Sequence, residues 1–137
     1  MPWDATPGGG FTTARPWRRF APGRERANVA AETGDSASLL SHYRDLIRAR
    51  HASPALRSGR LEVLRATGPL LVFLLTQADE CVPVAHNLRD RPASAPVSVR
   101  TSRAVPLFAS RGAALASSGG GWVTTLPANG SAAFRLQ

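Results

Sequence analysis

The sequence predicts a mostly β fold in which a long loop and one helix precede an antiparallel β-sandwich. Three observations support this prediction. The first 34 residues hold four prolines and a run of three glycines, which break helices and strands. Residues 35–51 then carry apolar side chains at spacings of three and four, as in an amphipathic helix. From Leu61 onward, short apolar runs alternate with turn residues to the end of the chain, which is typical of a sandwich.

The loop over residues 1–34 is rich in aromatic residues. Two of the three tryptophans, Trp3 and Trp17, lie within the first 17 residues. Aromatic rings in a Gly- and Pro-rich loop commonly form a binding surface, because glycine lets the backbone approach a ligand closely. The alternative is a poorly ordered tail whose tryptophans cover a neighbouring element. The loop residues alone leave both interpretations open.

The helix expected over residues 35–51 begins with Asp35 as its N-cap, directly after Gly34, and ends near Pro54. Its apolar stripe consists of residues three and four positions apart: Leu39, Leu40, Tyr43, Leu46 and Ile47, with Arg50 at the same spacing. Burying one Leu or Ile side chain contributes about 1.5–3 kcal/mol. We therefore expect this stripe to pack against a partner.

The strands are expected at residues 61–65, 70–75, 81–88, 96–100, 104–108, 113–116, 122–126 and 132–136. The second run is continuously apolar, as in the central strand of a sheet. The last two runs are separated by a turn over residues 127–130 and are expected to pair as a hairpin. Residues 117–121 are expected to form a flexible tip rather than a phosphate loop, because the lysine and following helix of that motif are absent.

Several spaced motifs together resemble family 13 of the glycoside hydrolases. They are Met1-Pro2-Trp3-Asp4, Gly10-Phe11-Thr12, Pro16-Trp17 and Asn28-Val29 in the loop; Ser38-Leu39-Leu40, Tyr43-Arg44 and Leu46-Ile47 in the helix; and Arg50, Pro54-Ala55-Leu56, Gly59, Leu126-Pro127 and Ala133-Phe134-Arg135-Leu136 beyond it. Within the family, they are most similar to the α-glucosidase, oligo-1,6-glucosidase and trehalose-synthase group. The family's Arg-Thr-Pro before Met-x-Trp-Asp is missing here. We therefore expect Met1 to be an internal methionine of a longer protein.

The resemblance implies a domain organisation and a set of site residues. Residues 1–57 would be a remnant of a (β/α)8 barrel domain, its last loop and helix, and residues 58–137 the C-terminal β-sandwich domain. Trp3, Asp4 and Phe11 would bind substrate near the sugar site, with Asp4 shaping the loop. Family members are retaining enzymes that use an Asp nucleophile, a Glu acid/base and a further Asp. Those residues lie upstream in the barrel, so no catalytic residue is expected in this chain.

The acidic residues, histidines and cysteine do not indicate another active site. Asp79 and Glu80 are adjacent and are expected to be a solvated pair on a turn. The three histidines stand too far apart for a metal site. Cys81 is the only cysteine, which excludes a disulfide within the chain and favours a buried, inert thiol. A Cys81–His86 nucleophile pair is conceivable, but both residues belong to an expected strand rather than to an open site. We expect no metal and no cofactor.

The charge is strongly positive but is not concentrated. The formal net charge is +8, and all 17 basic residues are arginine, spread from Arg15 to Arg135, which indicates a coding bias rather than a binding face. We therefore expect no specific nucleic-acid binding, although weak non-specific adhesion fits the charge. No apolar run reaches about 18 residues, so no membrane partner is expected. The N-terminus lacks the pattern of a secretory signal.

Three hypotheses for function remain. The favoured one is a C-terminal fragment of a cytoplasmic α-glucosidase-like glycoside hydrolase that acts on α-glucosidic bonds of small oligosaccharides. It would bind the oligosaccharide through the missing barrel, take an upstream barrel segment as partner and be inactive alone. The second is a free-standing carbohydrate-binding β-module, with Trp3, Trp17 or Trp122 stacking on sugar rings. The third is a basic, nucleic-acid-adhesive protein.

Overall fold

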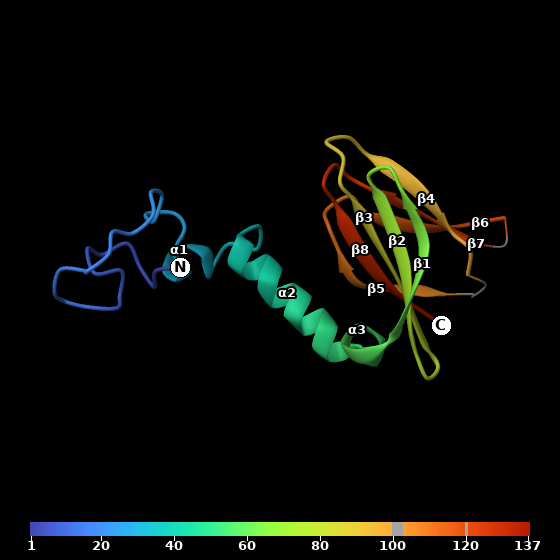
Figure 1. Cartoon of the computed structure of the whole chain (residues 1–137), viewed down its shortest axis with the longest axis horizontal. Coiled ribbons are helices and arrows are strands. Elements are labelled where there is room, and N and C mark those ends of the chain that lie inside the picture. The colour runs from blue at the N-terminus through green and yellow to red at the C-terminus, as the bar shows by residue number, and fades with distance from the viewer. Residues whose placement is uncertain (100–102, 120) are drawn as a thin grey trace. The chain divides into compact units, whose positions relative to one another are not determined.

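The computed structural model describes residues 1–99, 103–119 and 121–137 (Figure 1). The chain divides into two compact units, a loop unit (Met1–Ile47) and a sandwich unit (Arg48–Gln137). The helices are α1 (Val29–Glu32), α2 (Leu39–Ala52) and α3 (Pro54–Ser58). The strands are β1 (Arg60–Thr67), β2 (Leu70–Gln77), β3 (Glu80–Asn87), β4 (Ala93–Val97), β5 (Ala104–Ala109), β6 (Ala114–Ser118), β7 (Gly121–Leu126) and β8 (Ser131–Leu136).

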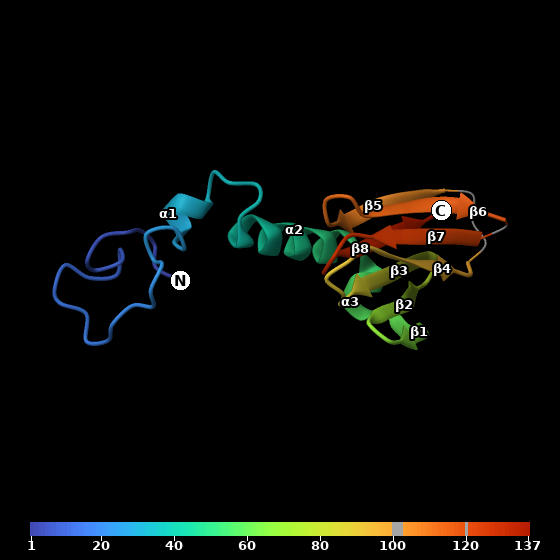
Figure 2. The ribbon, with the colours of Figure 1, turned by 90° about the horizontal axis from the view of Figure 1, so that it is seen from above.

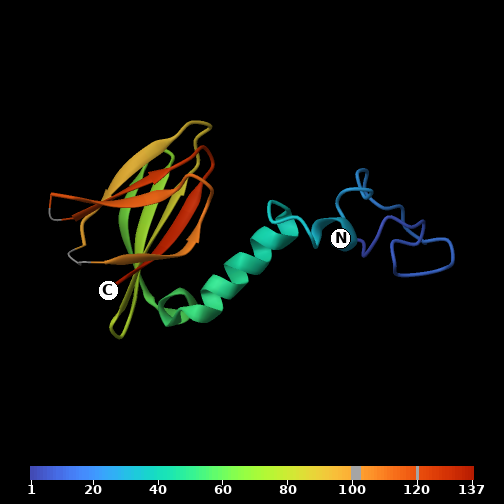
Figure 3. The ribbon, with the colours of Figure 1, turned by 180° about the vertical axis from the view of Figure 1, so that it is seen from behind.

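The sandwich unit consists of two antiparallel sheets, as the sequence predicts. One sheet has the strand order β1-β2-β3-β8-β5 and the other the order β4-β7-β6. Figure 2 shows the sandwich from above, and Figure 3 shows β6 and β7 from behind. The mostly β fold class is therefore confirmed. Seven of the predicted strands agree with observed ones apart from their ends. The fourth, expected at 96–100, is wrong in position, since β4 covers Ala93–Val97; residue 100 itself lies outside the described residues.

Two apolar layers hold the sandwich unit together. The core between the sheets includes Val72, Val97 and Leu126, all essentially inaccessible to water. A second cluster on the outer face of the larger sheet packs Ala55 of α3 against Val82 and neighbouring side chains. Because β2 contributes to both layers, every residue from Leu70 to Leu75 is at least partly buried. This explains why the run is continuously apolar rather than alternating.

The predicted hairpin of the last two strands is wrong. β7 pairs with β4 and β6, whereas β8 pairs with β3 and β5 in the other sheet. The turn over residues 127–130 is held by contacts outside the pair: Asn129 N–H donates to the Arg89 carbonyl, and the Asn87 amide donates to the Pro127 carbonyl at 2.8 Å. These bonds direct the chain across the sandwich, so the turn connects two sheets instead of closing a hairpin.

The helix predicted over residues 35–51 is present, but its predicted N-cap, Asp35, is wrong. α2 begins at Leu39, and the Ser38 hydroxyl accepts the Ser41 N–H at 3.2 Å, as an N-cap does. Asp35 instead accepts the Ala37 N–H within the preceding turn. The loop prediction also missed α1, a single turn capped by Asn28. On α2, Leu39, Tyr43 and Ile47 of the apolar stripe are exposed.

Candidate functional site

The first twelve residues form a tight loop whose backbone bonds to itself. The bonds run from Trp3 N–H to the Gly9 carbonyl, from Gly9 N–H to the Thr6 carbonyl and from Phe11 N–H to the Gly8 carbonyl, at 2.8–3.1 Å. Gly10 has φ +74°, and a Cβ there would lie 2.6 Å from the Trp3 Cβ. Since neither the conformation nor the space admits a side chain, the turn depends on glycine at this position.

Asn28 anchors this loop to α1. Its side chain is 2% exposed; the amide nitrogen donates to the Arg24 carbonyl at 2.7 Å and the oxygen accepts the Ala31 N–H at 2.8 Å. The start of α1 in turn receives the chain's first residues, because Val29 N–H donates to the Pro2 carbonyl and Ala30 N–H to the Trp3 carbonyl. Residues 1–12 are therefore held in place by a buried amide and an N-terminal helix turn, not left as a free tail.

The three residues predicted to bind substrate lie together in this loop. The rings of Trp3 and Phe11 are 6.3 Å apart between centroids with a tilt of 58°, and both side chains are more than half exposed. The Asp4 carboxylate accepts the hydroxyl and the N–H of Thr6, which together lower its pKa below the usual value. Asp4 thus fixes the turn, while the two rings present an accessible aromatic surface.

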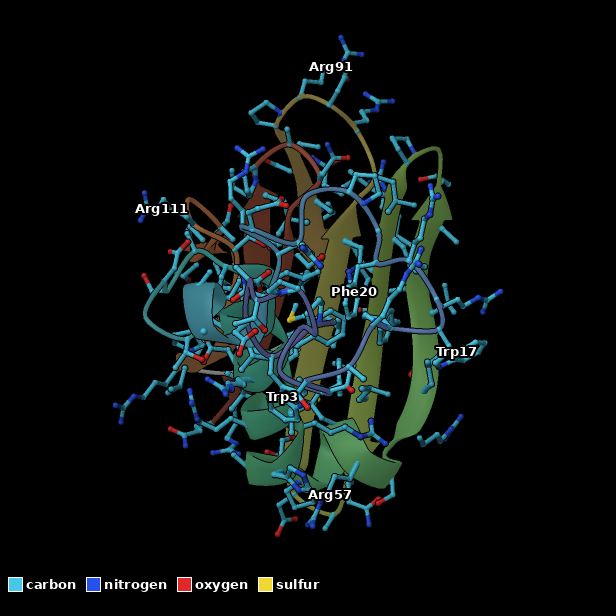
Figure 4. The ribbon with its side chains drawn as sticks, turned by 90° about the vertical axis from the view of Figure 1, so that its left-hand side faces the viewer. Trp3, Trp17, Phe20, Arg57, Arg91 and Arg111 are labelled. Carbon is cyan, nitrogen blue, oxygen red and sulfur yellow. The ribbon has the colours of Figure 1, made fainter. Side chains whose placement is uncertain are left out.

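The other tryptophans have different surroundings. Trp17 is 93% exposed, projects from the loop and lies 5.8 Å from the Arg18 guanidinium (Figure 4). Trp122 is partly buried and packs against the sandwich core. Of the three tryptophans, only Trp3 therefore combines an exposed ring with a fixed backbone and an aromatic neighbour.

Two adjoining cavities of about 390 Å³ each open on the loop unit. The first is basic, with Arg15, Arg18, Arg19 and Arg24 in its walls beside one acidic residue, Glu25. The second is more apolar, with Met1, Pro2, Phe11 and Ala27 in its walls. Both cavities share the stretch from Arg19 to Pro22 and Arg24. One of the predicted binding residues, Phe11, therefore lines a cavity.

The prediction for Glu80 is wrong. Asp79 is exposed, but the Glu80 carboxylate accepts from the Ser53 hydroxyl at 2.9 Å, the Ala55 N–H at 2.8 Å and the Arg135 Nε at 2.6 Å. Burial opposes ionisation of this carboxyl, but the three donors outweigh it and lower the pKa of Glu80. Glu80 therefore joins α3 to β3 and β8 and is fully engaged in structure.

Neither Cys81 nor the histidines form a reactive cluster. Cys81 is a free, half-buried thiol in β3, where burial was predicted to be complete. His86 shares a 2.8 Å hydrogen bond with the Ser131 hydroxyl, and burial lowers its pKa. Within the ranges that the structure describes, no three His, Cys, Asp or Glu side chains gather as metal ligands would. The longest described helix, α2, has 14 residues, too few to span a membrane.

Comparison with known proteins agrees with the loop motifs. Residues 1–59 match the family described as "Alpha amylase, catalytic domain". The whole chain is also similar to solved enzymes of this kind: it matches 98% of its length to the trehalulose synthase MutB of Pseudomonas mesoacidophila MX-45, at 28% identity and a TM-score of 0.79, covering 24% of that chain.

The chain belongs to the alpha-amylase family. Among curated alpha-amylase family members, it is 38% identical over 94 residues to a probable alpha-glucosidase of Rhizobium meliloti (strain 1021), which is 69% of this chain and 17% of that protein. It is 33% identical over 86 residues to the trehalose-6-phosphate hydrolase of Bacillus subtilis (strain 168), 62% of this chain and 15% of that protein. The chain thus spans about a sixth of the length of these relatives.

These findings place the chain among the glucosidase-like members of the alpha-amylase family. The family match ends at Gly59, close to the end of α3 at Ser58. The loop unit, α2 and α3 therefore lie within the matched catalytic-domain region, whereas all the strands, from β1 onward, lie beyond it.

Proposed function

We propose that this chain forms the last loop and helix of a (β/α)8 barrel and the C-terminal β-sandwich of an α-glucosidase-like glycoside hydrolase. In this proposal residues 1–57 belong to the barrel domain and residues 58–137 form the C-terminal domain. The whole enzyme cleaves or transfers α-glucosyl units on small oligosaccharides in the cytoplasm. The match of residues 1–59 to the catalytic domain, within a chain spanning a sixth of its relatives, is the observation that supports this assignment.

The catalytic carboxylates are proposed to come from a barrel segment that this chain does not hold. Retaining glycosidases need two carboxyl groups about 5–5.5 Å apart. In the loop unit, Asp4 is engaged by Thr6, and Glu32 accepts the Leu40 N–H at 2.8 Å. In the sandwich unit, Glu80 is held by three donors. These carboxylates have structural partners, which supports the proposal that the chain is inactive alone.

Within the assembled enzyme, Trp3 and Phe11 are proposed to contact the sugar while Asp4 holds the turn that carries them. Sugar rings have apolar C–H faces, and an exposed aromatic ring on a fixed backbone can stack on them. The backbone of Trp3 is fixed on both sides, through its N–H to Gly9 and its carbonyl to Ala30. The backbone that carries the ring therefore has little freedom to lose on binding.

The test is to supply the missing barrel. The 137-residue chain alone is expected to release no glucose from p-nitrophenyl α-glucoside, maltose or isomaltose. A fusion behind the barrel portion of the Rhizobium meliloti relative, in place of its own matching segment, is expected to release glucose. Release of glucose by the isolated chain would contradict the proposal, as would an inactive fusion that is folded by circular dichroism and carries the barrel's own carboxylates.

A free-standing carbohydrate-binding module is the second candidate. The exposed Trp3–Phe11 pair favours it, because stacking on sugar needs no catalytic group. Titration of tryptophan fluorescence with maltose or isomaltose distinguishes it: saturable quenching by millimolar sugar in the isolated chain would support the module, and an unchanged spectrum would remove it.

A nucleic-acid-binding function has less support. Arg57, Arg91 and Arg111 project from different edges of the sandwich unit (Figure 4). They belong to α3, to the turn after β3 and to the turn after β5. These three arginines therefore do not share one basic face that a phosphate backbone could follow.

A further inference from the structure

The loop unit carries a charge arrangement that a neutral sugar does not need. Four guanidinium groups, those of Arg15, Arg18, Arg19 and Arg24, share the walls of one cavity of about 390 Å³, and the only acidic residue there is Glu25. Like charges gathered around one open, solvent-exposed depression repel each other, and an anion that binds there relieves this repulsion.

Two of the four arginines are held by other groups. The Arg24 guanidinium donates to the Pro7 carbonyl at 3.3 Å and lies 5.4 Å from the centre of the Phe20 ring. Its contact with Glu25, at 3.9 Å, is long and exposed and neutralises little of the charge. Arg18 lies over the exposed Trp17 ring. Among the described residues, Arg15 and Arg19 make no hydrogen bond or ion pair, so their donors face solvent.

The shape of the neighbouring cavity indicates what the anion is attached to. The apolar cavity with Phe11, Met1 and Pro2 in its walls shares the wall residues Arg19, Phe20 and Arg24 with the basic one. A ligand that fits both has a C–H-rich ring at one end and a compact anion at the other. A guanidinium group can donate two parallel hydrogen bonds to two oxygens of one phosphate. Phosphate is therefore the anion best suited to a site with several arginines.

We propose that this pair of cavities binds a sugar phosphate, with the sugar ring beside Phe11 and the phosphate monoester among Arg15, Arg18 and Arg19. The phosphate part stands on the arginine cavity alone, whereas the choice of a sugar as the attached group rests on the proposed function. Arg24 contributes charge but remains bonded to Pro7, so it also fixes the wall between the two cavities.

The experiment compares three probes by isothermal titration of the 137-residue chain at low salt: glucose 6-phosphate, inorganic phosphate and glucose. Glucose 6-phosphate is expected to bind more tightly than inorganic phosphate, and glucose is expected to give no heat at the same millimolar concentration. Raising the salt concentration is expected to weaken glucose 6-phosphate binding. No binding of glucose 6-phosphate would overturn the proposal, and equal affinity for inorganic phosphate would overturn its sugar part.

Two matched variants distinguish binding by the cavity arginines from attraction by the overall positive charge. The double variant Arg18→Gln/Arg19→Gln is expected to weaken glucose 6-phosphate binding by about 10-fold or more, as loss of charge-assisted hydrogen bonds does. Arg26→Gln/Arg44→Gln removes two exposed charges from the same unit outside either cavity and is expected to change affinity by less than about 2-fold. Equal effects of the two changes would overturn the proposal, since only net charge would then matter.

Failure of this site would leave the proposed function untouched. The barrel fusion is assayed on neutral α-glucosides, whose hydrolysis does not require a phosphate group. A fusion that hydrolyses isomaltose while the chain shows no affinity for glucose 6-phosphate would overturn the sugar-phosphate site only. Binding of glucose 6-phosphate together with an inactive fusion would support the phosphate site and contradict the glycosidase assignment.

Discussion

Arg135 Nε donates to the Oε1 atom of Glu80 over 2.6 Å, and the same arginine donates through its Nη2 to the Ala52 carbonyl at 2.7 Å. Residue 135 lies in the last strand, Glu80 starts β3, and Ala52 ends α2. The pair therefore joins the C-terminal end of the helix to two strands of the larger sheet. Both side chains are mostly buried, at 29% and 12% exposure, so water screens their attraction weakly.

Replacing Glu80 by Gln is expected to lower the free energy of unfolding of the sandwich by about 2–3 kcal/mol. The change leaves the mostly buried Arg135 charge without its partner and weakens the bonds to Ser53 and Ala55. Urea unfolding followed by far-ultraviolet circular dichroism measures the loss. Asp79→Asn changes the neighbouring exposed carboxylate and is expected to shift stability by no more than about 0.5 kcal/mol. Equal losses in the two variants would contradict the assignment.

The contribution of Glu80 is expected to depend on pH in a defined direction. Its folded-state pKa lies below that of the unfolded chain, so the unfolded state binds the proton more readily. The stabilisation is therefore complete above the ordinary carboxyl pKa of about 4.3 and is lost as the pH falls through the folded pKa. The stability difference between wild type and Glu80→Gln is expected to be large near neutrality and to shrink in acid. A difference that stays constant with pH would contradict this origin.

The strands were predictable from the sequence, but the hydrogen bonds and the ion pair that join them were not. Apolar runs and turn residues located seven of the eight strands, because burial on a sheet face imposes a local pattern. Glu80 was misjudged because its neighbour Asp79 and the adjoining turn indicate solvent, while its partner Arg135 is 55 residues away. The sequence pattern could not show which sheet β8 joins, since the bonds to Arg89 and Asn87 that direct the chain are also non-local.

The candidate site was only partly predictable. The resemblance predicts Trp3, Asp4 and Phe11 as substrate-binding residues, and the structure places the three in one loop. The resemblance could not show that the Asp4 carboxylate accepts hydrogen bonds from Thr6 or that Asn28 anchors the loop, because those roles depend on the folded turn. The sequence does not reveal the basic cavity, because its arginines fit the chain-wide coding bias that the composition indicates. The available signal was four of them between Arg15 and Arg24, in a stretch also broken by Pro16 and Pro22.

His86 is expected to make the sandwich sensitive to mild acid. Burial lowers its folded-state pKa, so the unfolded chain takes up a proton first as the pH falls. Its stabilising contribution is therefore present above the ordinary histidine pKa of about 6.5 and declines below it. The melting temperature of the wild type is expected to fall more between about pH 7.5 and pH 5 than that of His86→Gln. His51, which is exposed on α2, provides the control: His51→Gln should follow the wild-type curve.

Trp3→Ala is expected to reduce kcat/KM of the barrel fusion for isomaltose by about 10-fold, the effect of losing about 1.4 kcal/mol of contact with the sugar. The variant keeps the Cβ that packs on Gly10 and the backbone bonds to Gly9 and Ala30, so the turn should remain. Trp17→Ala removes the same ring from a side chain that is 93% exposed and contacts only a neighbouring guanidinium, and it should leave kcat/KM within about 2-fold. Steady-state kinetics of both variants with isomaltose measure the two kcat/KM values. If Trp17→Ala costs as much as Trp3→Ala, the Trp3–Phe11 surface is not where the sugar binds.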